Sequence, residues 1–162
     1  MYNNFILFLS PIIEVFELMK KTLMLMLLVA IVIPIVIAFI ERTMFPEVAK
    51  HIIKRLPFDL NNKKLVLLNI IVGTFLEELI YRQVIQAVIT KFTSVPFAII
   101  VVSIAFTLMH YSSGQFSIVF FDLLGIFVDS VLYGLIFSRS NILFSWSAHC
   151  ISDLVGLLCL LI

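Results

Sequence analysis

The stretch Leu65–Ile89 reads LVLLNIIVGTFLEELIYRQVIQAVI and is the most informative segment of the chain about its architecture. It is long and apolar enough to cross a bilayer, which takes about 20 such residues. Glu77, Glu78 and Arg82 nevertheless lie in its middle. A charged side chain at the bilayer centre costs roughly 2.5–3.5 kcal/mol on insertion scales. The stretch is therefore predicted to be a transmembrane helix whose charged residues have a chemical task.

The composition of the whole chain is that of a membrane protein. Of its 162 residues, 62% are hydrophobic and 13% are charged, whereas a soluble domain has about 45–50% apolar and about 25% charged residues. The net charge is +1 and no basic patch is visible, so no nucleic-acid partner is predicted. The sequence predicts an all-α, multi-pass bundle in a prokaryotic cell membrane. Its spans, about five in number, are expected at Thr22–Ile40, Leu65–Ile89, Val95–His110, Phe116–Phe137 and Ile142–Ile162.

Two further segments are expected to be helical without spanning the membrane. Asn3–Leu18 is apolar but short and predicts an interfacial or partly inserted helix. Glu41–Lys64 holds six of the eleven basic residues. Its apolar stripe predicts an amphipathic helix on the membrane surface, with a solvated loop as the alternative. The stripe consists of Val48, Ile52, Ile53 and Leu56.

The two adjacent glutamates of the second span are predicted to have different tasks. Glu78 and Arg82 are four residues apart and can pair on one helix face. Glu77 points about 100° away and is left free as a base or a ligand. Glu78 and Arg82 are then a supporting pair. In the alternative reading, both glutamates only balance the charge of Arg82.

Polar and small residues also follow one face of the third and fifth spans, and such stripes are expected to face the interior of the bundle. On the fifth span, His149 and Asp153 lie one turn apart and can act on a single atom. Pairs of ligands with this spacing recur in metal-binding helices, although a His–Asp hydrogen bond that only joins helices is the alternative. The two stripes are Ser103, Phe106, Thr107 and His110, and Ser145, His149, Ser152 and Asp153.

The fourth span has a polar face of its own, made by Asp122, Gly125, Asp129 and Tyr133. Asp122 lies near the expected membrane edge and is read as solvated. Asp129 lies deep in the expected span, so it is expected to be protonated and hydrogen-bonded, or to orient one of the histidines by contacting its ring on the side away from the site. A packing role for Asp129 is equally compatible with the sequence.

Three short motifs, each in a separate span, resemble those of a known family. They are EELIYR at 77–82, FTLMH at 106–110 and HCISD at 149–153. Their types and order are similar to the CPBP family, the CAAX proteases and bacteriocin-processing proteins also called Abi. The resemblance covers roughly residues 65–162, as a four-helix catalytic core, with residues 1–64 as an N-terminal part. It implies an intramembrane endopeptidase, in which Glu78 and Arg82 match the supporting pair.

The resemblance also implies roles for four residues. Glu77 and His110 would activate a water, while His149 and Asp153 would hold the oxyanion or a metal ion. The family more often has Asn where this chain has Asp153, and an ionised Asp cannot donate a hydrogen bond to an oxyanion. Metal ligation, or a His149–Asp153 pair, is therefore favoured. The expected metal is zinc or another divalent ion, bound by these same four residues; otherwise no cofactor is expected.

Two other function classes stay open at this stage. The first is a non-catalytic immunity or partner-binding protein on the same scaffold, for which Glu77 would be dispensable. The second is a cation or proton transporter that uses Asp122, Asp129 and Glu77 as a relay. The expected partners are a peptide or lipidated peptide substrate and the lipid bilayer. The identity of the substrate and the formation of a homo-oligomer are left open.

Overall fold

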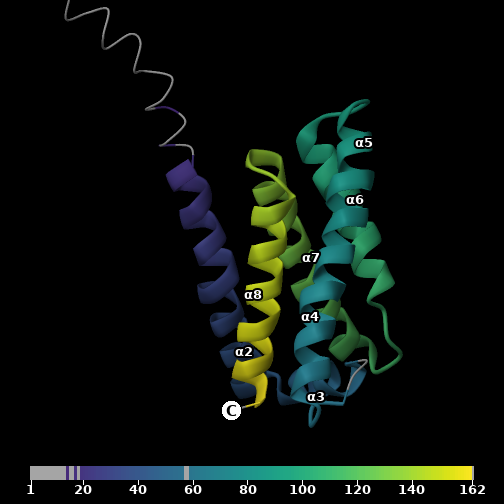
Figure 1. Cartoon of the computed structure of the whole chain (residues 1–162). Coiled ribbons are helices and arrows are strands. Elements are labelled where there is room, and N and C mark those ends of the chain that lie inside the picture. The colour runs from purple at the N-terminus through teal and green to yellow at the C-terminus, as the bar shows by residue number, and fades with distance from the viewer. Residues whose placement is uncertain (1–13, 15–16, 18, 57–58, 162) are drawn as a thin grey trace, which may run out of the picture.

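The computed structural model describes residues 14, 17, 19–56 and 59–161. Within these residues every regular element is a helix, and the long helices stand side by side as a bundle (Figure 1). The predicted all-α membrane bundle is therefore confirmed. The helix expected at Asn3–Leu18 lies almost entirely outside the described residues.

The first span is a single helix, Met19–Met44, with an irregular turn inside it. The turn is the π-helix η1 (Leu28–Val32), and α2 (Ile33–Met44) follows directly. Pro34 lies at the start of α2; it has no backbone N–H, and its ring crowds the carbonyl four residues earlier. A π-helical turn is a usual place for such a disturbance of the hydrogen-bond ladder.

The second span is one unbroken helix in three parts. It begins with α4 (Lys63–Glu78), continues as the π-helix η2 (Leu79–Gln86) and ends as α5 (Ala87–Thr90). Asn62 caps its start, since its side chain accepts a hydrogen bond of 3.1 Å from the backbone N–H of Leu65. The change from α-helix to π-helix occurs directly after the two adjacent glutamates, Glu77 and Glu78. Such π segments are frequent at functional sites.

Three more helices complete the bundle: α6 (Val95–Met109), α7 (Phe116–Arg139) and α8 (Ile142–Leu161). Helix α8 packs against η1, α2, α4 and α7, and α6 packs against α7. Among the described residues, three helices are long and apolar enough to cross a membrane, namely Met19–Met44, α7 and α8. The chain is thus an integral membrane protein. Of the other two predicted spans, α6 is apolar but shorter, and the helix from α4 to α5 carries the charged motif.

The basic connection forms helix α3 (Pro46–Arg55), which confirms a helix there rather than a loop. It packs against α2 and α7 at one end of the bundle (Figure 1). Val48 and Ala49 are buried, as expected for the apolar side of an amphipathic helix. That this helix lies on the membrane surface stays a prediction.

The interior of the bundle is divided into an apolar and a polar part. An apolar cluster joins the first span to α7 and α8 through Val29, Ala30, Tyr133 and Ile136. The polar part is fully or almost fully buried, while large apolar side chains are exposed on the outer faces of the helices. This distribution suits a lipid-facing exterior around a functional polar interior. The buried polar residues include Glu78, Arg82, Gln86, Ser103, Ser130 and Ser145.

Candidate active site

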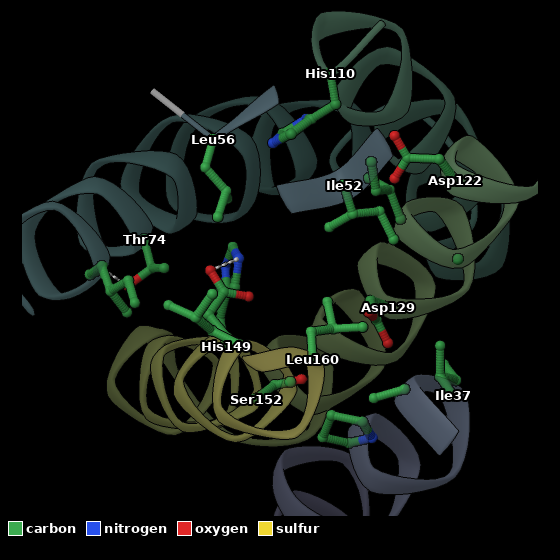
Figure 2. A pocket seen from close by; sticks show the side chains of 18 of the residues that line it. Ile37, Ile52, Leu56, Thr74, His110, Asp122, Asp129, His149, Ser152 and Leu160 are labelled. Carbon is green, nitrogen blue, oxygen red and sulfur yellow. Dashed lines mark hydrogen bonds and ion pairs between the residues drawn. The ribbon is translucent and has the colours of Figure 1, made fainter. Parts of the chain in front are cut away.

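A cavity of about 480 Å³ lies among α2, α3, α4, α6, α7 and α8. Its lining includes all four residues for which the sequence predicts a catalytic or ligand role. In Figure 2, His110, which directly follows α6, and His149 of α8 are both directed into this space. Helices that are far apart in the sequence therefore bring the three motifs to one site. The four residues are Glu77, His110, His149 and Asp153.

The carboxylate of Glu77 lies between the two histidines. Its Oε1 atom is 3.9 Å from Nε2 of His110, and its Oε2 atom is 3.7 Å from Nε2 of His149. Asp153 approaches the same ring, with its Oδ2 atom 3.7 Å from Nε2 of His149. These separations are too long for direct hydrogen bonds. The side chain of Glu77 is 36% exposed, so the cavity reaches its carboxylate.

Both histidine rings are anchored through their Nδ1 atoms. Nδ1 of His110 is 2.9 Å from the carbonyl oxygen of Phe106, and Nδ1 of His149 is 3.0 Å from Oε1 of Glu78. A carbonyl oxygen only accepts, so the neutral ring of His110 carries its hydrogen on Nδ1 and presents a lone pair on Nε2. Tyr133 stacks on His149 with ring centroids 4.4 Å apart, which holds that ring in place.

Glu78 and Arg82 form the predicted pair, with a separation of 3.4 Å and no exposed side-chain surface. The hydroxyl of Ser145 is hydrogen-bonded to the carboxylate of Glu78. Arg82 donates a hydrogen bond of 2.9 Å to Ser130 of α7, and its guanidinium lies 5.5 Å from the ring centroid of Phe106. The pair thus joins four helices behind the cavity. Sequence reasoning did not predict the contact between Glu78 and His149. A signal for it was present, because Ser145, which also contacts Glu78, lies on the same helix face as His149.

The expectation of a solvated Asp122 is wrong. Its side chain is 2% exposed and pairs with Arg55, the last residue of α3, through an Nε–Oδ2 distance of 2.7 Å. A second contact of 3.0 Å joins Nη2 of Arg55 to Oδ1. His51, one turn earlier on α3, lies 3.7 Å from the same carboxylate. Arg55 and His51 of α3 therefore surround the buried carboxylate of Asp122 in place of water.

Asp129 lines the cavity, as does Glu41 of α2. The Oδ1 atom of Asp129 is buried, and no hydrogen-bond partner for it is present among the described residues. One role that the sequence left open for Asp129 was to orient a histidine ring. Glu78 has this role at His149, and the carbonyl of Phe106 has it at His110. The structure therefore assigns Asp129 to the cavity wall.

The residue types of the site suit a zinc ion, which binds imidazole nitrogen and carboxylate oxygen. Histidines that bind metals also commonly have their other ring nitrogen anchored to an acceptor, as both rings do here. Within the described part of the chain, however, no group of three or more His, Cys, Asp or Glu side chains is placed so that it could hold a metal ion. The donor types of the site thus fit a metal ion, whereas the described side chains are not grouped as a finished metal site.

Comparison with known proteins identifies the family. The family described as "Type II CAAX prenyl endopeptidase Rce1-like" matches residues 60–155, more than half of the chain. The matched region contains all three motifs and confirms the resemblance based on them. No match was found among curated proteins or among solved structures. The chain belongs to the type II CAAX prenyl endopeptidase Rce1-like family and is a CAAX-type intramembrane endopeptidase.

Proposed function

We propose that the chain hydrolyses a peptide bond near the membrane with a water activated by Glu77 and His110. The observation that carries this proposal is the position of the Glu77 carboxylate between two Nε2 atoms, at 3.7 and 3.9 Å. Nε2 of a neutral His110 ring accepts a hydrogen bond, and so does the ionised carboxylate of Glu77. A water that lies between them can donate a hydrogen to each.

Glu77 is the general base in this mechanism. It takes a proton from the water, and the resulting hydroxide attacks the scissile carbonyl carbon. The same proton is then given to the departing amine when the carbon–nitrogen bond breaks. His110 orients the water, because its Nδ1–H is occupied by the carbonyl of Phe106.

His149 is placed to stabilise the oxyanion. In its imidazolium form the ring keeps Nδ1–H on Glu78 and presents Nε2–H to the cavity. Three carboxylates, those of Glu77, Glu78 and Asp153, lie within 4 Å of ring nitrogens and stabilise a positive charge there. A donor fixed in advance at the developing oxyanion is worth about 10²–10³ in rate.

A metal-dependent hydrolase is the alternative proposal. Zinc or another divalent ion would be held by Glu77, His110, His149 and Asp153. When bound, such an ion polarises a carbonyl and makes its bound water more acidic. This alternative needs the four side chains to move closer together than they lie here.

The proposed substrate is a peptide or lipidated peptide that reaches the cavity from the membrane, and the proposed location is the cell membrane of a prokaryote. Five of the six helices that line the cavity also belong to the bundle, while α3 closes one end. The lipid bilayer is the partner of the exposed apolar faces. Association into a homo-oligomer is compatible with this proposal.

The test is cleavage by purified protein in lipid vesicles. Two peptides are offered, one with a prenylated C-terminal CAAX sequence and one with the same sequence unprenylated, and the products are identified by mass spectrometry. We expect cleavage by the wild type and a loss of about 10²–10⁴ in rate for Glu77→Gln. Glu47→Gln is the matched control, because Glu47 is an exposed residue that pairs with the likewise exposed Lys50, outside the cavity.

The possible outcomes separate the function classes. A wild type that cleaves neither peptide, or a Glu77→Gln variant with full activity, overturns the proposed mechanism. The non-catalytic alternative additionally predicts that Glu77→Gln keeps its biological effect in cells. Cleavage of only the prenylated peptide would assign the lipid, rather than the peptide alone, to the recognised substrate.

A further inference from the structure

Glycines occur in the cavity wall on three different helices: Gly73 on α4, Gly125 on α7 and Gly156 on α8. A glycine inside a helix is ordinarily less stable there than alanine. In membrane proteins the usual compensation is close packing of a neighbouring helix against the glycine. Each of the three therefore needs either a packing partner or another use.

Packing does not account for Gly73 and Gly125. A Cβ atom added at either position would have nothing within 4 Å. Gly134, on the same helix as Gly125, shows the contrast. There an added Cβ would lie 3.0 Å from Oε1 of Gln86 and 3.2 Å from a side-chain carbon of Ile99. Gly134 is thus a packing glycine, whereas Gly73 and Gly125 face open space inside the cavity.

The open space at Gly73 adjoins the proposed general base. Gly73 lies one turn before Glu77 on the same helix, and both line the cavity. Four residues of helix span about 6 Å along the axis, which an extended peptide covers with about two residues. A substrate whose scissile bond lies at Glu77, and whose chain runs along α4 toward Gly73, places a residue within about two positions of that bond over Gly73.

Gly125 opens the opposite wall in the same way. In Figure 2, Thr74 of α4 and Asp129 of α7 lie on opposite sides of the cavity. Gly73 precedes Thr74 directly, and Gly125 lies one turn before Asp129. Both helices thus leave out a side chain where they face the same space. The remaining wall nearby is mixed, with the apolar Ile70 and Ile126 beside the polar Asn69, Thr74 and Asp129.

We propose that Gly73 and Gly125 determine the substrate specificity of the enzyme by leaving room for bulky side chains of the substrate next to the scissile bond. This inference rests on the proposed function, since it takes Glu77 as the site of cleavage. Without a side chain at these two positions, the walls accept a large residue of the peptide. A side chain introduced at either position would occupy the same space.

The experiment compares the wild type with Gly73→Leu and Gly125→Leu on a peptide series. The residues on each side of the scissile bond are varied one at a time among Ala, Leu and Phe, and kcat/KM is measured for each peptide. At one position of the series we expect each variant to lower the ratio of kcat/KM for Phe to that for Ala by roughly 10–200-fold. An equal loss for all peptides, or an unchanged ratio, overturns the inference.

Stability measurements accompany the kinetics. Gly73→Ala and Gly125→Ala are expected to unfold at a temperature no lower than that of the wild type, because the new methyl groups meet nothing. Gly134→Ala is the matched control. We expect it to lower the unfolding temperature and to affect all peptides equally. A clear loss of stability in Gly73→Ala would show that this glycine serves packing and would overturn its assignment.

Binding separates a failure of this inference from a failure of the proposed function. Affinities for the Ala and Phe peptides are measured with Glu77→Gln and with the double variant Glu77→Gln/Gly73→Leu. If the wild type cleaves nothing, the proposed function fails, and a selective loss of binding for Phe peptides still supports the subsite. If the wild type cleaves, Glu77→Gln does not, and the Phe-to-Ala ratio is unchanged, only the specificity inference fails.

Discussion

The Oε1 atom of Glu78 lies 3.0 Å from Nδ1 of His149, although the two residues are 71 positions apart in the chain. The same carboxylate pairs with Arg82 on its own helix. One buried acid thus joins the motif of the second span to the motif of the last span. Its neighbour Glu77 is open to the cavity, and this difference in burial separates a positioning residue from a proposed base.

Arg82→Met is expected to destabilise the protein strongly. The substitution removes Arg82 from the fully buried carboxylate of Glu78 and leaves the ring of His149 beside it, and breaking a buried ion pair costs about 3–5 kcal/mol. The free energy of unfolding in detergent micelles is the measurement. The double variant Glu78→Gln/Arg82→Met should lose less, because it leaves no lone charge. An Arg82→Met variant as stable as the wild type would show that the pair carries no such role.

His149→Ala is expected to lower kcat by about 10²–10³, because it removes the proposed oxyanion donor. The Michaelis constant should change little, since this interaction is made only in the transition state. Steady-state kinetics in vesicles measure both constants. Cys150→Ala, at the adjacent position of α8, is the control. A raised Michaelis constant with an unchanged kcat would assign His149 to substrate binding instead.

Asp153→Asn distinguishes the two proposed mechanisms. Asp153 lies 3.7 Å from the proposed oxyanion donor His149 and is itself 44% exposed. An asparagine there can donate a second hydrogen bond to the oxyanion, which an ionised aspartate cannot do. This bond offsets the lost carboxylate charge beside His149, so the water mechanism predicts that Asp153→Asn keeps its activity. A variant that loses both activity and a bound metal would support the metal-dependent alternative.

The metal content of the purified protein is the direct test of that alternative. We expect wild-type protein prepared without chelators to contain less than one equivalent of zinc by elemental mass spectrometry, and to keep its activity after chelator treatment. This expectation follows from the absence, among the described side chains, of a group placed to hold an ion. Stoichiometric zinc that disappears in His149→Ala would establish the metal site.

Arg55 and Asp122 are expected to hold α3 against α7. Their charge-assisted contacts are 2.7 and 3.0 Å long, and Asp122 is almost fully buried. The longer contact, from Nη2 of Arg55 to Oδ1 of Asp122, is a hydrogen bond. A hydrogen bond to a charged group contributes about 1.5–3 kcal/mol, and partial exposure of Arg55 brings the expected loss for Arg55→Met to the lower end. A double-mutant cycle with Asp122→Asn measures the coupling free energy. Additive effects of the two substitutions would show that the pair does not join the helices.

Much of the site could be read from local patterns. The pairing of Glu78 with Arg82, and the separation of Glu77 from both, follow from helix geometry alone. The approach of His149 and Asp153 has the same origin, because a spacing of four residues places both on one face. These predictions needed no knowledge of which helices are neighbours. That all three motifs line one cavity was an expectation from the resemblance, and the structure brings the motifs together.

The parts that sequence reasoning missed are contacts between helices. The position of Asp122 near the expected membrane edge predicts a solvated side chain, whereas its partner Arg55 comes from α3. Tyr133 stands on the polar face of α7, but its stacking on His149 depends on the rotation of α7 against α8. The π-helical segments likewise cannot be predicted from the hydrophobic pattern of the sequence.

The sequence by itself determined the helices and the faces on which the motifs lie, because bilayer-spanning length and the 3.6-residue period are properties of a single segment. The tertiary structure decided which faces meet. It alone showed that Glu78 holds His149, that Arg55 neutralises Asp122, and that Gly73 and Gly125 face empty space rather than a neighbouring helix. The physical reason is that such contacts depend on the relative positions and rotations of packed helices, which no single segment encodes.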